Sequence, residues 1–332
     1  MGSYLSGKIG QYLLVLWIAV TLNFLLPRMM PGNPLALIAG EDVNLLSPEQ
    51  RAELVARVGL DQPLIVQYGR YLQNILRGEL GYSFQWKQPV VDVLAQRLPW
   101  TILLTGTSLV IATIVGVVLG SLTAWRRGSR GDVGTFVFFL FLESLPAFWV
   151  GMLLVALFAV RWPLFPTFGA TSPWETLTGW DYILDVLHHL ALPLATLTIV
   201  SVSGTFIVAR SAMMAVLGEE FITVARAKGL AERQVLFRHA LRNALLPIAT
   251  VFTLNLAFAV SGATVVETVF SYPGVGRLIF EAVLSRDYPV IQAAFLMITV
   301  LVILANILTD AIYPLLDPRI RGAVSSAQGA AR

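Results

Sequence analysis

Long apolar stretches, separated by polar connections, dominate the hydrophobic pattern of this sequence. A helix needs about 20 apolar residues to cross the hydrocarbon core of a bilayer, and six stretches reach that length. They are Ile9–Pro27, Trp100–Trp125, Gly134–Val160, Leu190–Met214, Pro247–Val269 and Pro289–Leu308. The pattern predicts an all-α integral membrane protein with six transmembrane helices.

The first apolar stretch follows Lys8 and has the length of a signal-peptide core as well as of a membrane span. A signal peptide is followed by a cleavage site made of small residues. The segment Asn23–Met29 contains no such site. We therefore expect the first stretch to be an uncleaved membrane anchor.

The connections between the stretches differ in their content of lysine and arginine. The side that carries the N-terminus holds twelve basic residues against five acidic ones, whereas the long first loop on the other side holds seven of each. Cytoplasmic loops carry an excess of lysine and arginine. The charges predict that both termini are cytoplasmic.

Composition supports a membrane protein and narrows its chemistry. Of the 332 residues, 56% are hydrophobic and 13% are charged, whereas soluble domains are about 25% charged. The mean hydropathy is +0.73. The chain has no cysteine, which excludes a thiol nucleophile and a cysteine-ligated metal site. The adjacent His188 and His189 point to different sides of a helix, so we expect no metal site there.

The long first outer segment, residues 30–99, has the signals of a small helical cap. Ser47 and Gln50 have the spacing of a capping box at a helix start, and Gly59 would end that helix. A second helix is predicted from Pro63 to Gly78, and a third over Val90–Leu98, leading into the second span. The cap is either a structural lid or a docking surface for an external molecule.

The inner loop between the fourth and fifth spans, residues 216–246, is too polar to insert into a membrane. Glu219 and Glu220 precede a predicted short helix, and Lys228 lies near its end, so these charges complement the helix dipole. Gly229 suits the residue after the helix. The pattern predicts a short helix parallel to the membrane, a turn, and a second amphipathic helix. Such a surface either docks in the groove of a soluble partner or rests on lipid.

The inner loop also carries a family resemblance. The segments Ala225–Leu230 and Arg238–Pro247 resemble the coupling-loop signature of importer permeases of the ATP-binding-cassette class, in the dipeptide/oligopeptide/nickel branch. Thr223-Val224-Ala225 stands where the general signature has Glu-Ala-Ala. Stretches similar to the B-type permease of that branch run along nearly the whole chain: Leu26–Pro34, Ser144–Trp149, Phe270–Leu278, Arg286–Pro289 and Asp317–Arg321.

The resemblance implies a non-catalytic permease subunit in a bacterial cytoplasmic membrane. Its expected partners are a second, C-type permease, two ATPase subunits and an extracytoplasmic binding protein that delivers peptides. The sequence contains no phosphate-binding loop of the Gly-x4-Gly-Lys type, so ATP and Mg²⁺ would be bound by the partner ATPases. The residues expected to meet the ATPases are Thr223, Ala225, Arg226, Ala227, Lys228, Gly229 and Leu230.

The same resemblance divides the chain into four parts. These are an N-terminal transmembrane helix (1–29), an extracytoplasmic helical region (30–99), a transmembrane core that contains the inner loop (100–316), and a cytoplasmic tail (317–332).

Polar residues within the spans are the candidates for lining a translocation path, because a charge within the bilayer needs a partner or a wet cavity. Glu143, Asn255 and Glu267 are the candidates. Glu143 either faces the path or bonds a neighbouring helix. Glu267 and Asp310 are close to span ends, which favours interfacial or paired positions.

Other cargoes and other classes of protein remain as alternatives. Nickel or other metal chelates, oligosaccharides and opines are carried within the same branch. An ion-coupled secondary transporter would show internal repeats, and we find none. An intramembrane enzyme would need a catalytic constellation, and Ser201 and Ser203 lack a partner in sequence for one.

Overall fold

The computed structural model describes residues 2–29, 47–50, 53, 55, 61–83, 85–174, 176–260 and 263–316. Within them the regular structure is helical apart from one two-stranded antiparallel hairpin. Its elements are α1 (Gly2–Met29), α4 (Leu64–Arg77), β1 (Tyr82–Ser83), β2 (Gln88–Pro89), α5 (Val90–Thr101), the π-helix η2 (Ile102–Gly106), α6 (Thr107–Trp125), α7 (Arg130–Glu143), α8 (Ala147–Leu154), η3 (Val155–Arg161), α9 (Gly179–Leu217), α10 (Glu220–Ala227), α11 (Glu232–Gln234), η4 (Val235–Ala240), α12 (Leu241–Val260), α13 (Thr264–Val269), α14 (Val275–Leu284) and α15 (Tyr288–Leu316).

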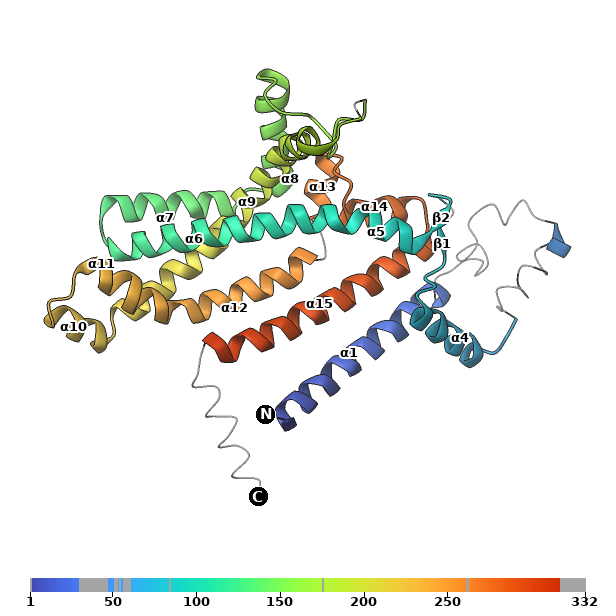
Figure 1. Cartoon of the computed structure of the whole chain (residues 1–332), viewed down its shortest axis with the longest axis horizontal. Coiled ribbons are helices and arrows are strands. Elements are labelled where there is room, and N and C mark those ends of the chain that lie inside the picture. Colours follow the sequence, from blue (N-terminus) through green and yellow to red (C-terminus); the bar gives the residue numbers. More distant parts are fainter. Residues whose placement is uncertain are drawn as a thin grey trace.

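Long helices lie side by side and form the body of the molecule (Figure 1). Among the described residues, four helical stretches are long and apolar enough to cross a membrane, and a bent helix pair makes a fifth candidate. The four are Lys8–Leu25, Val90–Trp125, Gly179–Leu217 and Tyr288–Asp310. The predicted membrane protein is confirmed, while the count of six spans stays a prediction.

The helix α9 is the centre of the bundle and packs most extensively against α6. Gly116 and Gly120 lie one turn apart on α6, where a Cβ atom would come within 2.9 Å of the Thr205 Cβ and within 2.8 Å of the Phe206 carbonyl oxygen, respectively. Small residues four apart let two helix backbones approach closely within a membrane. The α6–α9 contact therefore depends on these two glycines.

Two of the predicted single spans are interrupted. The third, Gly134–Val160, breaks after Glu143 into α7 and α8, whose axes differ by 97°. Pro146 explains the break, because proline cannot donate the backbone hydrogen bond that a continuous helix requires. The fifth, Pro247–Val269, is divided into α12 and α13, and Ala263 has a non-helical backbone at the start of α13.

The outer segment follows the prediction where the structure describes it. Ser47 and Gln50 exchange backbone-to-side-chain hydrogen bonds of 2.9 and 3.3 Å, the two bonds of a capping box. The second helix begins after Pro63 and ends at Gly78, which has a left-handed backbone. The third is continuous with the second span through η2. Gly59 lies outside the described residues.

Ionic contacts join helices that are far apart in sequence. Lys8 of α1 donates to Asp310 of α15 at 2.6 Å, so the paired position expected for Asp310 is confirmed. Asp132, near the start of α7, is buried and receives two hydrogen bonds from Arg210 of α9, at 2.8 and 3.0 Å. Each of these two carboxylates thereby meets an opposite charge on a neighbouring helix.

Candidate functional site

The inner loop forms a compact helical unit at one end of the bundle (Figure 1). As predicted, α10 begins after Glu219 and ends at Lys228, and Gly229 follows with a left-handed φ of 74°. The Gly229 N–H donates to the Arg226 carbonyl at 2.9 Å. After the turn, α11 and η4 lead into α12. The predicted order of helix, turn and second helix is confirmed.

One face of α10 packs on the protein and the other is open. Ile222 and Ala225 are buried against residues of α9 and η4 such as Met213 and Val235. Among the residues expected to meet an ATPase, Thr223, Arg226, Ala227, Lys228 and Gly229 are exposed, Leu230 is half-buried, and Ala225 faces the protein interior. Ala225 therefore contributes to the seating of α10 rather than to its outer face.

The open face of α10 carries large apolar side chains that lie outside the segment Ala225–Leu230. Phe221 and Val224 are 41% and 51% exposed, although both lie in an otherwise polar loop. Exposed large apolar side chains that gather on one surface mark interaction sites. The sequence of α10 already indicates this surface, because the helix contains more apolar residues than the two, Ile222 and Ala225, that its buried side uses.

Contacts of Arg226 connect α10 to the membrane helices. Its guanidinium lies 5.2 Å from the ring centroid of Trp125, at the end of α6, and 3.4 Å from the Glu232 carboxylate. A groove of about 460 Å³ runs over α11 and η4, lined by Ala231, Arg233, Gln234, Phe237 and Arg238. α10 is thus in contact with the end of α6 through Arg226 and Trp125, and its buried side shares a hydrophobic cluster with η4 and the start of α12.

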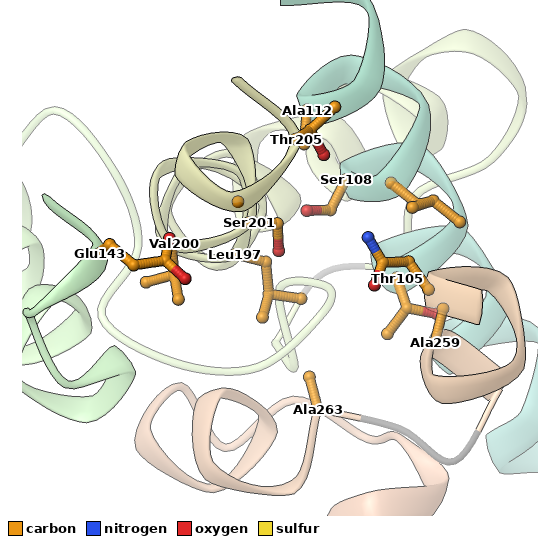
Figure 2. A pocket seen from close by; sticks show the side chains of 13 residues that line it. Thr105, Ser108, Ala112, Glu143, Leu197, Val200, Ser201, Thr205, Ala259 and Ala263 are labelled. Carbon is orange, nitrogen blue, oxygen red and sulfur yellow. The ribbon is translucent and has the colours of Figure 1, made fainter. Parts of the chain in front are cut away.

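A second candidate site is a cavity of about 300 Å³ within the helix bundle, bounded by η2, α6, α7, α9 and α12. Figure 2 shows Glu143 at one side of the cavity and Thr105 and Ser108 at the other, with residues of α9 between them. The lining residues are Thr105, Ser108, Leu109, Ala112, Glu143, Leu197, Val200, Ser201, Gly204, Thr205, Asn255, Ala259 and Ala263. The structure thus brings two of the predicted path-lining residues, Glu143 and Asn255, to one cavity.

Glu267, the third candidate for lining the path, is not part of this cavity. Its side chain is fully buried. Thr101 donates to its Oε1 at 2.9 Å, and the backbone N–H of Arg277 donates to its Oε2 at 2.9 Å. Gly274 passes so close that a Cβ atom there would lie 2.2 Å from the Glu267 Cδ. Glu267 therefore has hydrogen-bond partners within the protein, as expected for the paired position that its place near a span end favoured.

Sequence reasoning missed most of the polar lining. Thr105, Ser108 and Thr205 are small hydroxyl residues in apolar helices, where each reads equally well as a packing residue. Ser201 and Thr205 are four residues apart on α9 and therefore lie on one helix face. This spacing could have identified these two lining residues from the sequence.

The two adjacent histidines have separate partners. A ring nitrogen of His188 lies 2.7 Å from the Leu164 carbonyl oxygen, and Nδ1 of His189 lies 3.2 Å from the Asp185 carboxylate. Within the described part of the chain, no three histidine or acidic side chains gather in a way that could hold a metal ion.

The chain is similar to known permease proteins over most of its length. The chain is 38% identical over 323 residues to the dipeptide transport system permease protein DppB of Escherichia coli K12, covering 92% of this chain and 95% of that one. It is 36% identical to the di/tripeptide transport system permease protein DppB of Pseudomonas aeruginosa, covering 97% and 99%. A putative peptide transport system permease protein of Brucella abortus is also 36% identical, with the same coverage.

A solved structure and two family models agree with these relatives. A chain of the inward-facing MetNI methionine ABC transporter matches with a TM-score of 0.53 at 16% identity, covering 68% of this chain and 96% of that one, which supports the fold. Residues 1–105 match the N-terminal membrane component of binding-protein-dependent transport systems, and residues 116–322 match the model described as "Binding-protein-dependent transport system inner membrane component". Because that model covers most of the chain, the protein belongs to the family of inner membrane components of binding-protein-dependent transport systems.

Proposed function

We propose that this chain is the permease subunit of an ATP-driven importer and that, with a second homologous permease, it forms the translocation path for peptides. An extracytoplasmic binding protein would deliver the cargo, and two ATPase subunits would supply the driving force. The observation that carries the proposal is the near-complete alignment with dipeptide and di/tripeptide permeases. The exposed α10 and the polar cavity supply the two sites that such a subunit needs.

The inner loop would be the contact with the ATPases. Its support is the open face of α10, where Phe221 and Val224 are exposed and Lys228 adds a positive charge. A short rigid helix with an apolar outer face fits a groove on a soluble partner. ATP-driven closure of the partners would move α10, and the Arg226–Trp125 contact would transmit that movement to α6.

Six spans with both termini in the cytoplasm fit the arrangement of the helices. The start of α1, the end of α15 and the inner loop lie toward one end of the bundle, opposite to α4 and the β1–β2 hairpin (Figure 1). α12 would supply the sixth span. With this topology the basic inner loop would lie on the cytoplasmic side, in agreement with the distribution of lysine and arginine.

Peptides are the cargo that the relatives favour, while nickel chelates, oligosaccharides and opines are the alternatives within the same class. The cavity itself bears on this choice through its lining. It combines hydroxyl and amide groups with a carboxylate, a set that can bond the amides and the terminal ammonium of a peptide. An ion-coupled transporter would lack any use for an exposed apolar helix on the cytoplasmic side.

Purification of the tagged chain from its native membrane in mild detergent tests the assembly. Mass spectrometry should find a second permease and ATPases with phosphate-binding loops, together with a secreted binding protein. The ligand of that binding protein then identifies the cargo. Recovery of the chain alone, or only with itself, would contradict the proposal and turn attention to ion-gradient transport.

Gly229→Pro tests the role of α10. Gly229 has a φ of 74° and donates its N–H to Arg226, whereas proline requires a φ near −65° and has no N–H. We expect this variant to lose co-purifying ATPases and ATP-driven uptake. Gly78→Pro is the matched control, because Gly78 ends α4 with a φ of 77° and an equivalent hydrogen bond to Ile75.

A surface variant separates docking from folding. Val224→Asp places a charge on the open face of α10 without changing a buried residue. It should leave the amount of folded chain unchanged and weaken ATPase recovery. Normal uptake by both Gly229→Pro and Val224→Asp would exclude α10 as the coupling helix.

A further inference from the structure

Glu143 is the only charged side chain among the thirteen residues that line the cavity. It is exposed in the isolated chain, and within the described residues its carboxylate makes no hydrogen bond or ion pair. Arg210, a basic residue of the neighbouring α9, is already bonded twice to Asp132. Among the residues that the structure describes, Glu143 therefore has no cationic partner.

The depth of Glu143 makes this lack of a partner costly. It is the last residue of α7, which has 14 residues and is therefore about 21 Å long, less than the hydrocarbon thickness of about 30 Å. A carboxylate at such a depth is unfavourable unless it pairs or lines a wet cavity. Glu143 has the cavity.

The backbone beside Glu143 gives a second, independent sign of a binding site. The helix ends at this residue, and α8 departs at 97° after Pro146. Backbone that leaves a helix at membrane depth is tolerated where it is buried in protein or lines a cavity. In secondary transporters, substrate sites are typically built at such discontinuous helices, which shows that a broken helix at this depth is compatible with a binding site.

The opposite side of the cavity has a different chemical character. Figure 2 shows the hydroxyl residues Thr105 and Ser108 across the cavity from Glu143. Asn255, which also lines the cavity, carries an amide. The Thr105 hydroxyl donates to the Thr101 carbonyl at 2.7 Å. Ser108 accepts from Thr198 at 3.4 Å, so the Ser108 hydroxyl and the Asn255 amide are the groups that can donate to carbonyl or carboxylate oxygens of a bound molecule. The cavity thus combines one carboxylate with neutral donors, including Ser108 across from it, which complements a molecule with an ammonium at one end and oxygens at the other.

We propose that the cavity is a transient binding site for the backbone of the cargo and that Glu143 receives its N-terminal ammonium. The inference rests on the proposed function and adds the residue that selects for a free amino terminus. The cavity volume of about 300 Å³ lies at the lower end of the range for small-molecule sites, which suits a short peptide. The site would favour free peptides over N-blocked ones during passage.

The absence of cysteine from the chain permits a direct occupancy test. Ser201→Cys places a single thiol on the cavity, and the complete complex, with its binding protein and ATP, is labelled with a thiol reagent in the presence of dialanine or N-acetyl-dialanine. The assay is repeated with Glu143→Gln added. Glu79→Cys, on the exposed outer segment, is the labelling control.

We expect dialanine to slow labelling at position 201 and to leave position 79 unaffected. Loss of a charge-assisted hydrogen bond should raise the dialanine concentration for half-maximal protection about tenfold in the Glu143→Gln background. N-acetyl-dialanine should protect in neither background. A Glu143→Asp variant should recover most of the protection, because it restores the negative charge.

Two results would overturn the inference while leaving the proposed function intact. One is ATP-driven uptake of dialanine without protection of the cavity thiol. The other is protection at the same concentration in both backgrounds, or equal protection by the N-acetylated peptide. Absence of any ATP-driven dialanine uptake by the unmodified complex would instead refute the peptide cargo itself.

Discussion

Two glutamates in apolar helices have opposite surroundings, and the regions around them differ accordingly. Glu267 is fully buried and receives hydrogen bonds from Thr101 and from the backbone of Arg277. Glu143 lies on a cavity, beside a broken helix, without a described partner. The first carboxylate holds the α13–α14 corner against α5, and the second is available to something that enters.

The comparison teaches that an acidic residue within a span does not by itself indicate a path. Sequence reasoning placed both glutamates among the path-lining candidates, because each carries the same cost of burial. What distinguishes them is how many donors the fold brings to each carboxylate. Substitutions at Glu267 should therefore affect stability, and substitutions at Glu143 should affect transport.

The largest expected effect belongs to Gly274→Ala. The new Cβ would lie 2.2 Å from the Glu267 Cδ, so the carboxylate must leave its donors. Overpacking of about 1–3 kcal/mol is then added to the cost of the lost hydrogen bonds. The variant should show a strongly lowered unfolding temperature in detergent. The double variant Gly274→Ala/Glu267→Ala should be no less stable than Glu267→Ala, because the clashing atoms are gone, and strict additivity of the two losses would contradict this packing.

Glu267→Ala should have the next largest effect. It leaves the Thr101 hydroxyl and the Arg277 N–H without their acceptor, and each buried unsatisfied group costs about 1–3 kcal/mol. Glu267→Gln keeps one oxygen acceptor and should lose less. Thermal unfolding of the purified chain measures the series, and equal stability of all three proteins would break the contrast with Glu143.

Gly204→Ala should have the smallest effect and tests the cavity side of the comparison. A Cβ at this position would lie 3.8 and 3.9 Å from the two carboxylate oxygens of Glu143, which is ordinary contact. We expect a free energy of unfolding within about 0.5 kcal/mol of that of the parent protein. Dialanine uptake should fall modestly, because the added methyl group shields the Glu143 carboxylate. A large loss of folded protein would show that Glu143 is tightly packed after all.

The sequence was sufficient for the parts of the fold that depend on local signals. The apolar stretches, the capping box at Ser47, the end of α4 at Gly78 and the helix–turn–helix order of the inner loop all follow from spacing, capping and glycine chemistry. The family resemblance of residues 225–247 was likewise readable, because its residues are contiguous. These features need no knowledge of distant contacts.

The parts that escaped prediction depend on contacts between remote segments. The 97° turn after Glu143 was signalled by Pro146, but its angle is set by the packing of α8 against α9 and α13. The partner of Glu267 is Thr101, which lies 166 residues away. Likewise, the cavity exists only where η2, α9 and α12 meet. Ala225 was expected to meet the ATPases with the rest of its segment, but it is buried against the protein, because a sequence signature does not say which side of a helix is buried.

Uptake measured per folded complex, for Glu143→Gln beside Glu267→Gln, tests the central claim most directly. The complete complex is reconstituted in vesicles, and ATP-driven dialanine uptake is divided by the amount of complex that survives size-exclusion chromatography. We predict that Glu143→Gln yields a normal amount of complex with reduced uptake, and that Glu267→Gln yields less complex with normal uptake per molecule. Unchanged uptake per molecule in Glu143→Gln, together with a loss in Glu267→Gln, would contradict the roles assigned to the two carboxylates.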